Sequence, residues 1–128
     1  MAKTKVHFEY PMNCQSEILY EYLATSDGLS EWFADEVTEQ GDDFFFSWDG
    51  SAPEKATLIR YKVESFVRYR WEADEGTKNY FEMKIVIDEI TEDLSLNITD
   101  FSEEGDEDEV KQYWDNLIEN LQIKLGAA

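Results

Sequence analysis

Few residues of this sequence could perform acid–base, nucleophilic or metal chemistry. Among 128 residues, His7 is the only histidine and Cys14 the only cysteine. His7 falls on the polar side of an alternating segment, so we expect it to face solvent. No serine–histidine–aspartate triad can be built around it, and the carboxylates are spread along the chain instead of clustered as a metal site requires. The sequence therefore favours a non-enzymatic protein without metal or cofactor, and it indicates no catalytic residue.

Aromatic residues are the more concentrated feature. Residues 44–50 read FFFSWDG. In a strand, successive side chains point to opposite faces, so Phe44, Phe46 and Trp48 share one face. Such a wall either fills a close-packed core or lines a cavity for an apolar ligand. The pattern alone leaves both interpretations open.

Composition limits the classes of partner. Asp and Glu number 30 against 11 Lys and Arg, which gives a formal net charge of −19, yet 42% of the residues are hydrophobic and 15% aromatic. These values indicate a folded domain with an acidic surface. Because that surface repels phosphate and anionic lipid, we expect neither nucleic acid nor a membrane as a partner. No signal peptide or run of about 18 apolar residues is visible, so we expect a cytoplasmic monomer formed by one domain, residues 1–128.

The N-terminal third predicts one strand and two short helices. Residues 3–10 alternate and predict a strand ended by Pro11. Residues 15–24 change to helical spacing. A second short helix follows, for which Ser26 or Asp27 is the expected cap. Its apolar side carries Leu29, Trp32 and Phe33.

The remainder predicts an antiparallel sheet covered by one long helix. From residue 37 to 101 the period is two, with turn residues between short runs, which favours hairpins. One of these strands is expected to carry Thr57, Ile59, Tyr61 and Val63 on a single face. From Asp106 onward, apolar residues recur at helical spacing along roughly 30 Å. Asp106 and Glu109 predict a capping box at the start of this helix.

Three stretches resemble the START-like (SRPBCC) superfamily. They are YEYLATSDGLSEWFAD (20–35), FFFSWDG (44–50) and YWDNLIENLQIKL (113–125). Within the superfamily the chain is most similar to single-domain bacterial members of the branch related to the activator of the ninety-kilodalton heat-shock chaperone's ATPase. The resemblance implies an α+β helix-grip fold. In that fold a curved antiparallel sheet of about six or seven strands wraps around a long C-terminal helix, with two short helices after the first strand.

The resemblance also implies where a ligand would lie. In the helix-grip fold a cavity separates the long helix from the concave face of the sheet. The residues expected to line it are Trp32, Phe33, Phe44, Phe46, Trp48, Tyr61, Tyr69, Trp71, Phe81, Trp114 and Leu117.

Three hypotheses about function follow. The leading one is non-enzymatic binding of a small hydrophobic or amphipathic ligand in this cavity. The alternative is a protein-interaction or chaperone-regulatory module with a filled core, which acts through its charged surface on a protein partner. The third is a cyclase- or hydrolase-like enzyme. The aromatic wall and the resemblance favour ligand binding, with no cofactor.

Overall fold

The computed structural model of the protein describes residues 3–126. These residues form seven strands: β1 (Thr4–Met12), β2 (Glu36–Gln40), β3 (Asp43–Ser47), β4 (Glu54–Lys62), β5 (Phe66–Trp71), β6 (Phe81–Ile87) and β7 (Leu94–Ser102). Their α helices are α1 (Ser16–Ala24), α2 (Ser26–Leu29) and α3 (Glu107–Leu125), and a short 3-10 turn, Glu72–Asp74, follows β5.

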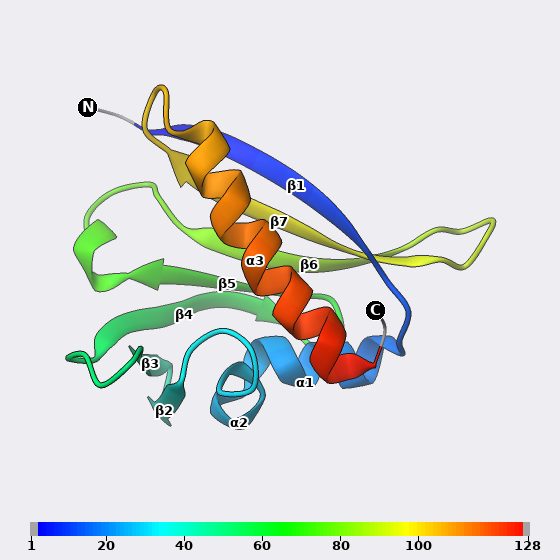
Figure 1. Ribbon diagram of the computed structural model, residues 1–128, viewed down its shortest axis with the longest axis horizontal. Helices are drawn as coiled ribbons and strands as arrows, with labels where there is room; N and C mark the ends of the chain where they lie inside the picture. Colours follow the sequence, from blue (N-terminus) through cyan, green and yellow to red (C-terminus); the bar gives the residue numbers. More distant parts are fainter. Residues whose placement is uncertain (1–2, 127–128) are drawn as a thin grey trace.

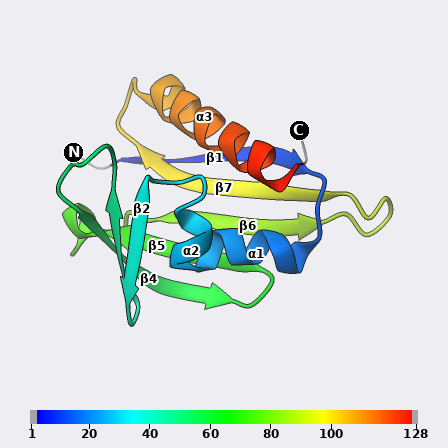
Figure 2. The same ribbon diagram turned by 60° about the horizontal axis from the view of Figure 1, so that its bottom comes forward.

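The strands form one antiparallel sheet in the order β1-β7-β6-β5-β4-β3-β2. Its concave face is covered by α3, which crosses the sheet diagonally, and by α1 and α2 near the C-terminal end of α3 (Figure 1). Figure 2 shows β2 and β3 turned across the end of the sheet that carries α2. The protein therefore has the predicted α+β helix-grip fold, with a sheet of seven strands.

Helix α3 forms where the apolar stripe predicts it. Its sheet-facing residues Trp114, Leu117, Ile118 and Leu121 are buried. The first turn is acidic, and its negative charge interacts favourably with the positive end of the helix dipole. Gly126 ends the helix in the left-handed conformation at φ 69°. The predicted capping box is wrong, because Asp106 makes no side-chain cap. The carboxylate of Glu107 instead accepts the N–H of Gly105 at 3.0 Å.

Strand β1 continues past Pro11, which was expected to end it. Pro11 lies opposite Ser95 of β7, and Met12 opposite Leu94. Strand β1 is the edge of the sheet and pairs only with β7. A proline has no N–H to donate, but an edge strand needs donors on one side alone, so the strand tolerates Pro11.

A β-bulge in β4 changes which of its side chains face the core. The register shifts between Leu58 and Arg60. Thr57 lies opposite Arg70, on the outer face, whereas Leu58 lies opposite the buried Tyr69 and packs against the core. The predicted single face of Thr57, Ile59, Tyr61 and Val63 is therefore wrong. The bulge adds one residue and breaks the period of two.

Helix α2 is shorter than predicted and is held tightly against α1. Its cap is Thr25, whose Oγ1 accepts the N–H of Gly28 at 2.9 Å, and not Ser26 or Asp27. A Cβ built on Gly28 would lie 2.2 Å from the carbonyl oxygen of Glu21 and 2.6 Å from the Cα of Tyr22. Gly28 thus permits the close approach of α2 to α1, which fixes the position of the following turn.

Candidate functional site

Phe33 fills the space between α3 and the sheet. It follows α2 in a turn and is 2% exposed. Its ring is stacked on Phe81 at a centroid distance of 5.7 Å, and it lies 5.2 Å from Phe46 and 5.9 Å from Trp114. Aromatic rings at these separations are in favourable contact. The aromatic wall predicted from FFFSWDG is therefore largely the packed core of the protein, with Phe33 as its central residue.

Hydrogen bonds hold the turn that carries Phe33. The indole Nε1 of Trp32 donates to the carbonyl of Tyr22 at 2.8 Å. The indole Nε1 of Trp48 donates to the carbonyl of Phe33 at 3.0 Å. The Ser30 hydroxyl accepts the N–H of Val37 at 3.0 Å and donates to the Ser26 carbonyl at 2.7 Å. The backbone of the turn is thereby tied to α1, β2 and the end of β3.

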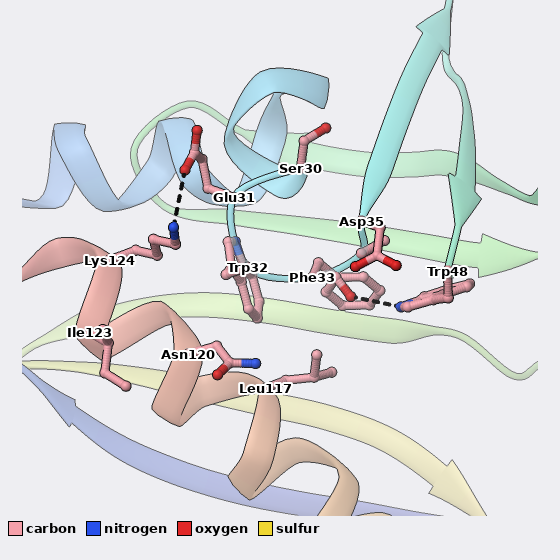
Figure 3. Close-up of a pocket in the computed structure, with 11 residues that line it drawn as sticks. Ser30, Glu31, Trp32, Phe33, Asp35, Trp48, Leu117, Asn120, Ile123 and Lys124 are labelled. Atoms are coloured by element: carbon pink, nitrogen blue, oxygen red, sulfur yellow. Dashed lines mark hydrogen bonds and ion pairs between the residues drawn. The ribbon is translucent and has the colours of Figure 1, made fainter. Parts of the chain in front are cut away.

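An open pocket of ≈ 390 Å³ lies between this turn and the C-terminal half of α3. Trp32, Phe33, Trp48 and Leu117 provide its apolar wall. Figure 3 shows Trp32 and Asn120 projecting into the space between the turn and the helix. Ala34 and Ile123 complete the apolar lining.

Polar groups stand at the rim of the pocket. The Lys124 ammonium lies 3.8 Å from the Glu31 carboxylate, which links α3 to the turn. The Asp35 carboxylate accepts the N–H of Asp49. Asn120 and Ser30 also line the pocket. Two carboxylates against one ammonium leave this rim with a net negative charge.

The predicted ligand residues separate into three groups. Phe44, Phe46, Tyr69, Phe81 and Trp114 are at most 1% exposed and form the closed core. Trp32, Phe33, Trp48 and Leu117 line the open pocket, and Trp71 packs beside Trp48 at a centroid distance of 6.2 Å. Tyr61 is 58% exposed near the end of β4. The structure thus brings ten of the eleven predicted residues into one continuous aromatic and aliphatic cluster and leaves Tyr61 at its surface.

The polar lining of the pocket was not predicted. Asn120 follows Leu117 by three residues and Lys124 follows Asn120 by four, so the three share one face of α3. That spacing is the sequence signal that could have found them. Glu31 and Asp35 flank the Trp32–Phe33 pair, but nothing in their pattern distinguishes them from other surface carboxylates.

Asp100 is a partly buried carboxylate of β7 that contacts Trp114 of α3. Its Oδ2 accepts the Trp114 Nε1–H at 2.8 Å, and its Oδ1 accepts the N–H of Phe101 at 2.7 Å. Burial raises the pKa of Asp100 above its usual value, against the lowering effect of these two hydrogen bonds and of Lys3. The folded protein therefore takes up this proton at a higher pH than the unfolded chain does.

We expect Asp100→Asn to remove a pH dependence of stability. A raised pKa in the folded state means that acidification through that pKa stabilises the fold. The difference in unfolding free energy, wild type minus variant, should therefore increase as the pH falls from 7 toward 4. Urea unfolding at a series of pH values and constant ionic strength measures it. A difference that decreases on acidification would contradict the assignment.

Within residues 3–126, no group of three His, Cys, Asp or Glu side chains is placed to hold a metal ion. In the same described range, no helix is long and apolar enough to cross a membrane.

The fold and the pocket define a class of protein in which a long helix closes over a curved sheet. A family model for the START-like superfamily domain matches residues 1–127, and the chain belongs to this superfamily. This membership confirms the resemblance of residues 20–35, 44–50 and 113–125. No curated protein matches the chain.

Solved structures show the same fold. A solution structure of a protein from Bacteroides fragilis is 36% identical, with a TM-score of 0.71 and coverage of 97% of this chain and 92% of that one. The Aha1 dimer of Colwellia psychrerythraea is 14% identical, with a TM-score of 0.77 and coverage of 95% and 96%. A protein of Bacillus halodurans is 16% identical, with a TM-score of 0.74 and coverage of 98% and 99%. The last two likenesses concern the fold alone.

Proposed function

We propose that the protein binds a small amphipathic ligand in the open pocket between α3 and the turn after α2. The observation that supports this most is the pocket itself, whose ≈ 390 Å³ is lined by Trp32, Phe33, Trp48 and Leu117. Ligand pockets of proteins are typically about 300–1,000 Å³, mostly apolar, with a few placed polar groups. Because Phe33 fills the interior, the ligand lies against the outside of the core and does not enter it.

The rim favours a ligand whose polar end is uncharged. Glu31 and Asp35 oppose an anionic head, and Lys124 is already close to Glu31. The Ser30 hydroxyl already donates to and accepts from the backbone. The Asn120 amide, which is both a donor and an acceptor, is the group suited to a hydroxyl or carbonyl of the ligand. Sterols and hydroxylated aromatic polyketides meet these conditions better than fatty acids do.

A ligand-observed saturation-transfer NMR screen of sterols, aromatic polyketides and fatty acids tests the proposal. We expect saturable binding, with neutral hydroxylated compounds ahead of fatty acids. Leu117→Trp fills the pocket and should weaken binding at least about tenfold. Asn120→Ala should reduce the preference for hydroxylated compounds. Ile90→Trp is the matched control, because Ile90 is 92% exposed in the β6–β7 turn.

Comparison of the two tryptophan variants decides whether the ligand binds in the pocket. Binding weakened by Leu117→Trp to this extent and unchanged by Ile90→Trp supports the pocket. If no compound transfers saturation, or if both tryptophan variants behave alike, the proposal is wrong. Circular dichroism of each variant establishes that the fold is retained.

A protein-interaction or chaperone-regulatory role is the second candidate, supported by the filled interior. Basic residues also gather on the outer face of β4 and β5. There Arg68 pairs across the strands with Glu82 at 2.8 Å, while Arg60 lies opposite Arg68. Stimulation of a bacterial ninety-kilodalton chaperone ATPase, reduced by salt and by the double variant Arg60→Glu with Lys62→Glu, would favour this role. An unchanged ATPase rate would remove it.

A further inference from the structure

A second cleft adjoins the candidate pocket and has a different character. It has a volume of ≈ 350 Å³ and lies beyond the end of the sheet where β4 begins and β5 ends. Trp48 lines both this cleft and the ligand pocket. The cleft is otherwise lined by Lys3, Glu54, Trp71, Ala73, Asp74 and Tyr113. Three aromatic rings and two carboxylates therefore meet in one depression.

A hydrogen bond and contacts with buried aromatic rings hold the two indoles of this cleft in place. The centroids of Trp48 and Trp71 are 6.2 Å apart, with an interplanar angle of 49°. Trp48 is fixed by its hydrogen bond to the Phe33 carbonyl, and Trp71 packs on Phe46 at 5.2 Å and on Phe81 at 5.3 Å. Both indoles remain only partly buried. The electron-rich face of an indole attracts a cation within about 6 Å of its centroid.

The charges around the cleft have the sign that such a cation needs. Glu54 and Asp74 contribute two carboxylates and Lys3 one ammonium, so the lining is net negative. The adjoining depression shares Lys3 and Tyr113 with the cleft and is itself lined by four acidic residues, Asp100, Glu103, Asp106 and Glu109. Burial, together with the negative charges of Asp100 and Glu54, raises the pKa of Tyr113, so its phenol keeps its proton and adds no charge.

We propose that this cleft binds a small organic ammonium ion, at a site separate from the amphipathic-ligand pocket. An anion would meet two carboxylates here. A metal ion would need converging ligands, and the described residues 3–126 offer no group of three acidic, histidine or cysteine side chains placed to hold one. A diffuse cation on a large organic group fits aromatic faces with carboxylates at a distance.

Choline and its neutral isostere 3,3-dimethyl-1-butanol provide the test. They have the same shape, but a carbon of the alcohol replaces the positively charged nitrogen of choline. Each is titrated into ¹⁵N-labelled protein, and the indole N–H resonances of Trp48 and Trp71 are followed. We expect saturable shifts with choline at millimolar concentrations, weakened by added salt, and no saturation with the neutral compound. Equal responses to the two compounds, or none to choline up to roughly 100 mM, would overturn the proposal.

Variants locate the site. Glu54→Gln and Asp74→Asn should each weaken choline binding roughly two- to fivefold, the scale of one exposed ion pair. Glu89→Gln in the β6–β7 turn is the matched control and should leave it unchanged. Lys3→Gln removes the competing ammonium and should tighten binding. Weaker choline binding in Lys3→Gln, or equal effects of Asp74→Asn and Glu89→Gln, would contradict the site.

Discussion

Phe33→Ala should lower the free energy of unfolding by about 3–5 kcal/mol, the usual cost of removing a buried phenylalanine. The reason lies in its central position, since the ring contacts Phe46, Phe81 and Trp114 from the turn after α2. The turn is tied by hydrogen bonds from Trp32 and Trp48, so we expect the space left by the ring to stay open. Urea unfolding followed by circular dichroism measures the loss.

Phe45→Ala is the matched control for this prediction. Phe45 lies on the same strand as Phe44 and Phe46 but on the outer face, and it is only partly buried. Its replacement should cost about 1 kcal/mol. The cavity left by Phe33→Ala should also accept a small apolar probe such as benzene, since apolar cavities of this kind stay dry and bind such molecules. Equal losses for the two variants would show that Phe33 does not fill the interior.

Gly28→Ala should cost about 3 kcal/mol, a large effect for one added methyl group. The new Cβ would lie 2.2 Å from the Glu21 carbonyl oxygen and 2.6 Å from the Tyr22 Cα, so α1 and α2 must separate. Both atoms belong to the backbone and cannot rotate away, and overpacking of this kind typically costs 1–3 kcal/mol or more. Separation of the helices would also displace the turn that carries Trp32 and Phe33.

Gly41→Ala separates this packing effect from the general cost of replacing a glycine. Gly41 has φ 63°, and a Cβ there would meet nothing within 4 Å. Its replacement should cost about 1 kcal/mol through backbone conformation alone. Thermal and urea unfolding of the two variants provide the comparison. If Gly28→Ala were no more destabilising than Gly41→Ala, the tight α1–α2 contact would be wrong.

Periodicity predicted most of the fold because burial follows it. The α3 stripe and the alternation of β1 and β6 place their apolar residues as expected. The errors occurred where a single local feature determines which face a side chain lies on or where a strand ends. One extra residue at Leu58–Arg60 reverses the faces of β4, and an edge position lets β1 continue through Pro11. Neither feature changes composition or spacing enough to be visible in one sequence.

The aromatic residues of the site were predicted, but the sequence did not show whether they enclose a cavity or a filled core. Spacing places Phe44 and Phe46 on one face, but it does not show whether a ring from elsewhere fills the space they enclose. That ring is Phe33, which was expected on a helix and lies instead in the turn after it. The direction of such a turn depends on tertiary contacts such as the Trp48–Phe33 hydrogen bond. The polar lining from α3 was likewise missed, although Leu117, Asn120 and Lys124 have helical spacing.

The most direct test of ligand binding follows the four tryptophan indole N–H resonances during titration with a neutral hydroxylated sterol or polyketide. Trp32 and Trp48 line the pocket, whereas Trp114 is 1% exposed in the core and Trp71 lines only the second cleft. The proposal predicts saturable shifts of Trp32 and Trp48 that exceed those of Trp71 and Trp114. Unchanged spectra across the panel, or shifts largest at Trp71 or Trp114, would show that the pocket beside Phe33 is not the ligand site.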